Sequence, residues 1–167
     1  MARSHRRKAV PIIAIVLALL VWAAREFGPD LFRTAPWPGS EWRTVVRVVD
    51  GDTLLLDGDE RVRLIGIDTP ETVDPRRPVQ YFGKEAAAFT RRMAEGKRVR
   101  LDYDQERTDR YGRTLAYVFL EDGTFLNAEI IRQGYAHAYT RFPFQYSDQF
   151  RAYEREAREQ RRGLWAE

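Results

Sequence analysis

Residues 42–67, WRTVVRVVDGDTLLLDGDERVRLIGI, hold three short stretches of mostly β-branched and aliphatic side chains. The first runs from Trp42 to Val49, the second from Thr53 to Leu56 and the third from Arg61 to Ile67. Asp50-Gly51 divides the first two, and Asp57-Gly58 follows the second. An Asp-Gly pair between stretches of this kind is a strong hairpin signal. The segment therefore predicts three consecutive antiparallel strands.

The spacing of apolar residues changes after this segment. From Phe82 the apolar side chains follow a helical period, and a glycine, Gly96, comes at the end. The residues of this apolar stripe are Phe82, Ala86, Phe89 and Met93. A stripe of this period predicts an amphipathic helix that packs on the sheet.

The rest of the chain predicts two more strands and two helices. The strands are expected at Arg98 to Tyr103 and Leu115 to Leu120, and the helices at Leu126 to Gln133 and Ser147 to Arg162. Five short strands with a helix between the third and the fourth match the Greek-key barrel called the OB-fold. We therefore predict an α+β protein, a five-stranded OB-fold β-barrel with flanking helices.

The amino-terminal part has a different composition from the barrel. Residues 1–8 carry a basic cluster, residues 9–24 carry no charge, and residues 25–40 are rich in proline and glycine. A basic cluster before an apolar run is an export signal. As a helix the run would span about 24 Å, short of the ~30 Å hydrocarbon core, so a transmembrane anchor and a signal peptide cleaved after Ala23 both stay open. We expect a linker at 25–40 and a folded domain at 41–167.

This organisation predicts an exported protein. It would be anchored to the outer face of the cytoplasmic membrane through the apolar segment, or secreted if that segment is cleaved. A third interpretation, a buried core helix, leaves the basic flank without an explanation. We expect the exported domain to be a monomer.

Composition excludes some classes of protein. With 44% hydrophobic and 32% charged residues, the chain has the composition of a folded globular protein and not of a disordered one. Because it has no cysteine, it has neither disulfides nor thiolate metal ligands. The net charge of +3 comes from the amino terminus: four of the 28 basic residues lie in residues 1–8, which leaves 24 against 25 acidic side chains. Binding of nucleic acid must therefore depend on local groups of residues.

Several polar residues on the predicted strands or next to them could carry the chemistry of phosphodiester cleavage. That reaction needs a metal ion that polarises the phosphate, a carboxylate that acts on water, and cations for the charge that builds on the phosphate oxygens. The candidates are Asp52, Arg63, Asp68, Thr69, Glu71 and Arg113.

Each candidate also has an ordinary interpretation. Asp50-Gly51-Asp52 could be only a hairpin turn, Arg63 could face solvent from its strand, and Arg113 could lie in a turn after Gly112. His137 is interpreted as a surface or structural residue and not as a general base. Only the combination of the candidates makes a catalytic site the better hypothesis.

Five motifs together resemble the staphylococcal nuclease family. They are VDGDTLLL (49–56), VRLIGIDTPE (62–71), YFGKEAAAF (81–89), RTDRYGRTLAYV (107–118) and IRQGYA (131–136). Their order and spacing are similar to those of the family over residues 45 to about 165. The resemblance implies hydrolysis of DNA or RNA with little sequence specificity, which leaves 3′-phosphate ends.

The same resemblance implies roles for individual residues. Asp52, Asp68 and the carbonyl group of Thr69 would be ligands of a calcium ion. Glu71 would act on the attacking water, directly as general base or through metal-bound water. Arg63 and Arg113 would bind the scissile phosphate, where a guanidinium group can donate two parallel hydrogen bonds.

Two tyrosines would complete the site by the same resemblance. Tyr111 would contact a terminal phosphate, and Tyr139 would stack on a base. The chain departs from the family's pattern in a shorter hairpin between Leu56 and Arg61, in the loop TVDPRRPVQ (72–80), and in a segment around Tyr139 that is one residue short. The alternative function is a nuclease-like barrel that binds nucleic acid without cutting it.

Overall fold

The computed structural model describes residues 41–72 and 78–166. The expected anchor or signal peptide and the linker, and Arg76 and Arg77 of the loop 72–80, lie outside the described residues. In the two described ranges, no helix is both long enough and apolar enough to cross a bilayer.

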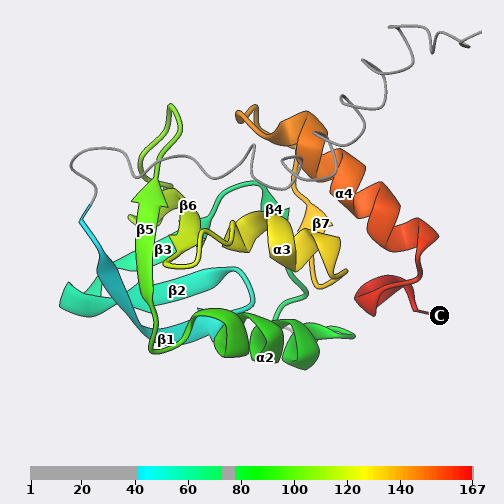
Figure 1. The fold of residues 1–167 in the computed structure, drawn as a ribbon, viewed down its shortest axis with the longest axis horizontal. Helices are drawn as coiled ribbons and strands as arrows, with labels where there is room; N and C mark the ends of the chain where they lie inside the picture. The colour runs from blue at the N-terminus through cyan, green and yellow to red at the C-terminus, as the bar shows by residue number, and fades with distance from the viewer. Residues whose placement is uncertain (1–40, 73–77, 167) are drawn as a thin grey trace, which may run out of the picture. The chain divides into compact units, whose positions relative to one another are not determined.

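Five strands close into a barrel in the order β1-β2-β3-β6-β5 (Figure 1). They are β1 (Arg43–Asp50), β2 (Thr53–Leu56), β3 (Arg61–Leu64), β5 (Arg98–Asp102) and β6 (Thr114–Leu120). β1, β2 and β3 pair antiparallel in chain order, as predicted. β3 pairs parallel with β6, and β5 joins β6 to β1 in antiparallel fashion. Helix α2 (Gly83–Ala94) lies between the third and fourth barrel strands in the chain, so the predicted OB-fold is confirmed.

The third predicted strand, Arg61 to Ile67, is wrong in one respect, because the chain turns at Gly66. β3 ends at Leu64, and Ile67–Asp68 forms a separate short strand, β4, that pairs with β7 (His137–Ala138). Gly66 has a φ of 77°, a left-handed conformation that favours glycine. Alternation of apolar residues continues through such a turn, so the sequence pattern did not reveal it.

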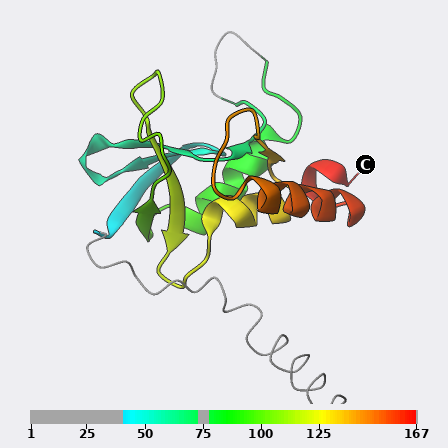
Figure 2. The same ribbon diagram turned by 90° about the horizontal axis from the view of Figure 1, so that it is seen from above.

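The helices α2 and α3 (Leu126–Arg132) pack on the barrel and α4 (Ser147–Glu159) packs on α3 and β7 (Figures 1 and 2), and their bounds differ slightly from the predicted ones. The 3₁₀ turns are η2 (Asp57–Asp59) and η3 (Gly163–Trp165). α4 ends at Glu159, earlier than the predicted Arg162. The buried face of α2 is also shifted from the predicted stripe: its buried side chains are Ala86, Ala87, Thr90 and Ala94. Small residues let this helix lie close to the barrel, where the hydroxyl group of Thr90 donates to the carbonyl of Gly51.

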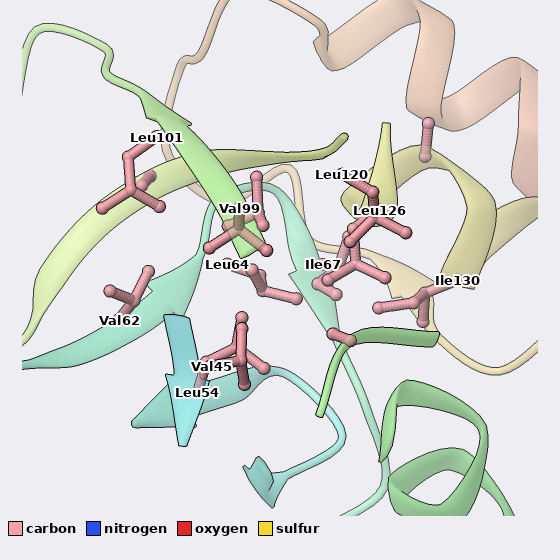
Figure 3. Close-up of a cluster of buried hydrophobic side chains, with 14 of the residues drawn as sticks. Val45, Leu54, Val62, Leu64, Ile67, Val99, Leu101, Leu120, Leu126 and Ile130 are labelled. Atoms are coloured by element: carbon pink, nitrogen blue, oxygen red, sulfur yellow. The ribbon is translucent and has the colours of Figure 1, made fainter. Parts of the chain in front are cut away.

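The hydrophobic core fills the barrel and continues beneath α3 and α4 (Figure 3). Its strand residues alternate along the chain, and the fully buried ones include Val45, Leu54, Leu56, Val62, Val99, Ala116 and Val118. Burying each large aliphatic side chain contributes about 1.5–3 kcal/mol. Because Val62 and Leu64 of β3 point inward, Arg63 between them points to the outer face of the barrel.

Candidate active site

Arg63 joins two of the predicted metal ligands on the outer face of the barrel. Its Nη1 lies 3.0 Å from Oδ2 of Asp52, and its Nη2 lies 3.3 Å from Oδ1 of Asp68. The register brings them together, because Thr53, next to Asp52, lies opposite Arg63 in the β2–β3 pair. Asp68 arrives through the turn at Gly66. Three predicted site residues, which come from β3 and from positions next to β2 and at the end of β4, therefore share one cluster.

Thr69 is fixed against the Asp52 carboxylate. Its backbone N–H and its hydroxyl group both donate to Oδ2 of Asp52 at 3.2 Å. Gly51 makes this approach possible, because a Cβ atom there would lie only 2.7 Å from Oγ1 of Thr69. The segment Asp50-Gly51-Asp52 is thus a turn that also packs against Thr69, the residue directly after β4.

Arg113 reaches the same cluster through a threonine. Its Nη1 lies 3.5 Å from Oγ1 of Thr53, and that hydroxyl group donates to Oδ1 of Asp52 at 3.0 Å. Asp109 orients the guanidinium group: its Oδ2 lies 2.7 Å from both Nε and Nη2 of Arg113. Burial raises the pKa of Asp109, but hydrogen bonds from the backbone and side chain of Arg113 outweigh it and lower the pKa below its usual value.

Glu71 and Asp50 add negative charge beside Asp52. Oε1 of Glu71 accepts the N–H of Thr72, and Oδ1 of Asp50 accepts the Thr72 hydroxyl group at 2.7 Å. Burial is the main reason that the pKa of Asp50 is raised to about 6, and the charges of Asp52 and Glu71 raise it further. Burial likewise raises the pKa of Asp68, against the opposing effect of Arg63.

These carboxylates fit a hard cation that is held only in part by side chains. Within residues 41–72 and 78–166, no group of three or more Asp, Glu, His or Cys side chains is arranged to hold a metal ion by itself. Calcium also takes backbone carbonyl groups and water as ligands. Asp52 and Asp68, both within 3.3 Å of one guanidinium group, with the Thr69 carbonyl, are oxygen ligands of the kind that calcium accepts.

The predicted tyrosines lie at two edges of the cluster. Tyr111 is 69% exposed, and the guanidinium carbon of Arg113 lies 5.6 Å from its ring centroid. The backbone N–H of Tyr139 donates to the carbonyl of Gly66 at 2.9 Å, which places Tyr139 beside the turn before Asp68. His137 lies opposite Asp68 in the β4–β7 pair, with its Nδ1 3.4 Å from Glu154 of α4.

Sequence reasoning missed three residues that the structure places in this cluster. Asp50 was interpreted only as a turn residue, although its side chain is buried beside Asp52 and Thr72. Asp109 stands four residues before Arg113 in RTDRYGR, and this spacing of opposite charges was a signal for the pair. Thr53 gave no signal, because a threonine in a strand is ordinary.

Several curated proteins are similar to this chain over most of its length. A thermonuclease of Staphylococcus hyicus is 38% identical over 161 residues, which covers 93% of this chain and 94% of the relative. A thermonuclease of Staphylococcus intermedius is 46% identical over 132 residues, covering 77% of this chain and 78% of the relative. The endonuclease YncB of Bacillus subtilis is 36% identical over 129 residues, covering 74% of this chain and 61% of the relative.

The barrel, its clustered carboxylates and guanidinium groups, and these relatives define a nuclease, an enzyme that hydrolyses phosphodiester bonds. The family model described as staphylococcal nuclease homologue matches residues 61–167. The chain belongs to that family, and the resemblance seen in its motifs is confirmed.

Proposed function

We propose that this nuclease hydrolyses DNA, RNA or both in a calcium-dependent reaction with little sequence specificity, leaving 3′-phosphate ends. The observation that carries this proposal is the position of Arg63, which lies 3.0 Å from Asp52 and 3.3 Å from Asp68 on the outer face of the barrel. Arg113 contacts the hydroxyl group of Thr53, which in turn donates to Asp52. Anionic oxygens for a cation and guanidinium groups for a phosphate are thus within reach of one substrate group.

In this proposal the carboxylates of Asp52 and Asp68 and the carbonyl group of Thr69 hold the calcium ion. When bound there, the ion would polarise the scissile phosphate and neutralise charge in the transition state. The contacts of Thr69 with Asp52 hold this carboxylate in one orientation before the ion arrives. Hydrogen bonds to a metal ligand from neighbouring residues usually raise the affinity of the site for its metal ion.

Arg63 and Arg113 bind the equatorial oxygens of the phosphate in this proposal. A guanidinium group suits this role because it stays charged and donates from a planar fork. Asp109 fixes Arg113, and Asp52 and Asp68 hold Arg63, so both groups are oriented before substrate binds. Preorganised donors of this kind stabilise charge that develops in the transition state.

Glu71 acts on the attacking water, directly as general base or through water bound to the metal. The N–H of Thr72 donates to its Oε1 and orients the carboxylate. The water gives a proton to Glu71 as its oxygen bonds to phosphorus and the bond from phosphorus to the 5′ oxygen breaks. The 5′ oxygen takes a proton from solvent water, and Glu71 returns its proton to the solvent. Tyr111 contacts a terminal phosphate, and Tyr139 stacks on a base, which suits any sequence because every base has a π-face.

Removing calcium tests this proposal. We expect the purified protein to degrade plasmid DNA or single-stranded RNA in calcium and to lose at least about 10² in rate with a chelator, because metal polarisation contributes several kcal/mol. Added calcium should restore the rate. The products should resist extension by a polymerase until a phosphatase removes their 3′-phosphate.

Two other outcomes of this assay would contradict the proposal. Degradation that continues unchanged in the chelator would exclude the calcium requirement. Tight binding of nucleic acid without any cleavage in calcium would favour the alternative, a barrel that only binds.

We also propose that the protein acts outside the cytoplasm as a monomer, either anchored by residues 9–24 or secreted after cleavage. The basic cluster and uncharged run support export. The match to the Staphylococcus hyicus thermonuclease covers 93% of this chain, so it takes in part of residues 1–40.

The mass of the mature protein distinguishes the two forms of export. We expect it in the membrane fraction at full mass if the segment is an anchor, and in the medium without residues 1–23 if it is cleaved. Full-length protein found only in the cytosol would contradict export. Sedimentation of the mature protein checks the monomer.

A further inference from the structure

We propose that Tyr103 and Arg107, on the loop between β5 and β6, form a further subsite that binds the substrate strand beyond the scissile phosphate. The ligand is a nucleotide unit of a single-stranded nucleic acid: a base that stacks on the tyrosine and a phosphate that binds the arginine. This inference rests on the proposed function, because it extends the same binding face. The loop projects from the barrel (Figures 1 and 2).

The pairing of backbone segments places Arg107 in line with the active site. The N–H of Leu115 donates to the carbonyl of Arg107 at 2.9 Å, next to the bridge between Thr108 and Thr114. Leu115 in turn lies opposite Arg63 in the β3–β6 pair. Residues opposite one another in paired strands project from the same face of the sheet.

Arg63, Leu115 and Arg107 therefore form a row across neighbouring segments on the outer face of the barrel. Neighbouring strands lie about 4.8 Å apart, so Arg107 is roughly 10 Å from Arg63 across the sheet. A strand whose phosphate lies at Arg63 can continue along this row and reach the loop.

The side chains of Tyr103 and Arg107 are already arranged as a stack. The guanidinium carbon of Arg107 lies 4.1 Å from the ring centroid of Tyr103, and Tyr103 is 39% exposed. Among the residues that the structure describes, Arg107 forms no salt bridge with an acidic side chain. By contrast, Arg100 is paired with Asp102, and Arg113 with Asp109. The positive charge of Arg107 is therefore not neutralised by a neighbouring carboxylate.

An arginine stacked on an exposed aromatic ring suits single-stranded nucleic acid. Proteins that bind single strands use cationic groups along the backbone and aromatic rings on which bases stack. The same loop holds a second pair of this type, in which Arg110 lies 4.7 Å from the ring centroid of Tyr111, beside Arg113. Two such pairs on one loop, one beside Arg113 and one farther from it, define a path for a strand that leaves the active site.

Substrate length tests the subsite. We would compare kcat/KM for a thymidine decanucleotide with that for a trinucleotide, in calcium, for the full chain and its variants. Tyr103→Ala should lower the ratio of the two values about 5- to 100-fold, because one stacked base is lost. Arg107→Ala should lower the ratio too, and should reduce the slope of log binding constant against log salt by about 0.7, as expected for one phosphate contact.

Conservative variants and a matched control separate this role from a structural one. Tyr103→Phe keeps the ring and should keep the ratio, and Arg107→Lys should keep the salt slope. Arg98→Ala is the control, because Arg98 is also exposed and lies 5.7 Å from an aromatic ring, that of Trp42, but at the opposite end of β5. It should change neither quantity.

Failure of the subsite and failure of the proposed function give different results. If the unchanged protein cleaves both substrates and the ratio is the same in Tyr103→Ala and Arg107→Ala, the subsite is wrong. If the unchanged protein cleaves neither, the proposed function is wrong, and binding of the decanucleotide still decides the subsite. Equal affinities of the unchanged protein and both alanine variants would then overturn it.

Discussion

Replacing Arg113 with alanine lowers kcat for DNA about 10²- to 10³-fold, the usual effect of losing one preorganised donor to a developing oxyanion. The guanidinium group is held on one side by Asp109 and on the other by Thr53, which itself contacts Asp52. It is therefore oriented before substrate binds, and water cannot replace it at the same position. The measurement is kcat and KM at saturating calcium.

Two further variants distinguish this role of Arg113 from a general loss of structure. Arg113→Lys should recover only part of the rate, because an ammonium group cannot contact Asp109 and Thr53 in the same way. Asp109→Asn keeps the arginine but weakens its orientation, so we expect a smaller loss than in Arg113→Ala. A kcat for Arg113→Ala within about 3-fold of the unchanged protein, with the thermal transition preserved, would remove Arg113 from the chemistry.

Gly66→Ala should lower the free energy of unfolding by about 2–5 kcal/mol. A left-handed conformation costs about 1–2 kcal/mol once a Cβ is present, and forcing atoms into a packed core typically costs 1–3 kcal/mol more. The added Cβ would lie only 2.6 Å from the Phe144 ring and 2.9 Å from Phe150. Urea unfolding measures this loss as a lower midpoint at constant slope.

Gly123 is the matched control for this substitution. It also has a positive φ, 86°, but no atom lies within 4 Å of the Cβ that alanine would add. Gly123→Ala should therefore lose only the conformational contribution of about 1–2 kcal/mol. Equal losses at the two positions would show that the contact with the phenylalanine rings has no effect. Because Gly66 directs the chain toward Asp68, a proposed ligand of the metal ion, the Gly66 variant should also bind calcium more weakly if that proposal holds.

The barrel was predictable because its signals are local. Asp50-Gly51 marks a hairpin, the β-branched and apolar residues of β1 mark a strand, and the alternation from Arg61 marks β3. The break at Gly66 was not predictable, because glycine conformation leaves the apolar alternation unchanged. The buried face of α2 differs from the predicted stripe because the small side chains of Ala87, Thr90 and Ala94 pack more closely on the barrel than larger side chains would.

The candidate site, like the fold, has a part that the sequence predicts and a part that it does not. Asp52, Arg63 and Arg113 were identified from their types and motifs, and the structure brings them together. The hydrogen bonds that hold them, through Thr53 and Asp109, depend on strand register and on the path of a loop. Such contacts follow only from the closed barrel, because no periodicity in the sequence encodes a distance between β2 and the start of β6.

The parallel pair of β3 and β6 closes the barrel between segments far apart in the chain. Contacts between such distant segments form late in folding, after the entropy of a long loop has been lost. Arg113 directly precedes β6, and Asp52 directly precedes β2, so the two halves of the proposed active site meet only when this seam closes. In the export proposed above, a chain that crosses the membrane before this seam closes would be harmless to the chromosome and transcripts of the cell that makes it.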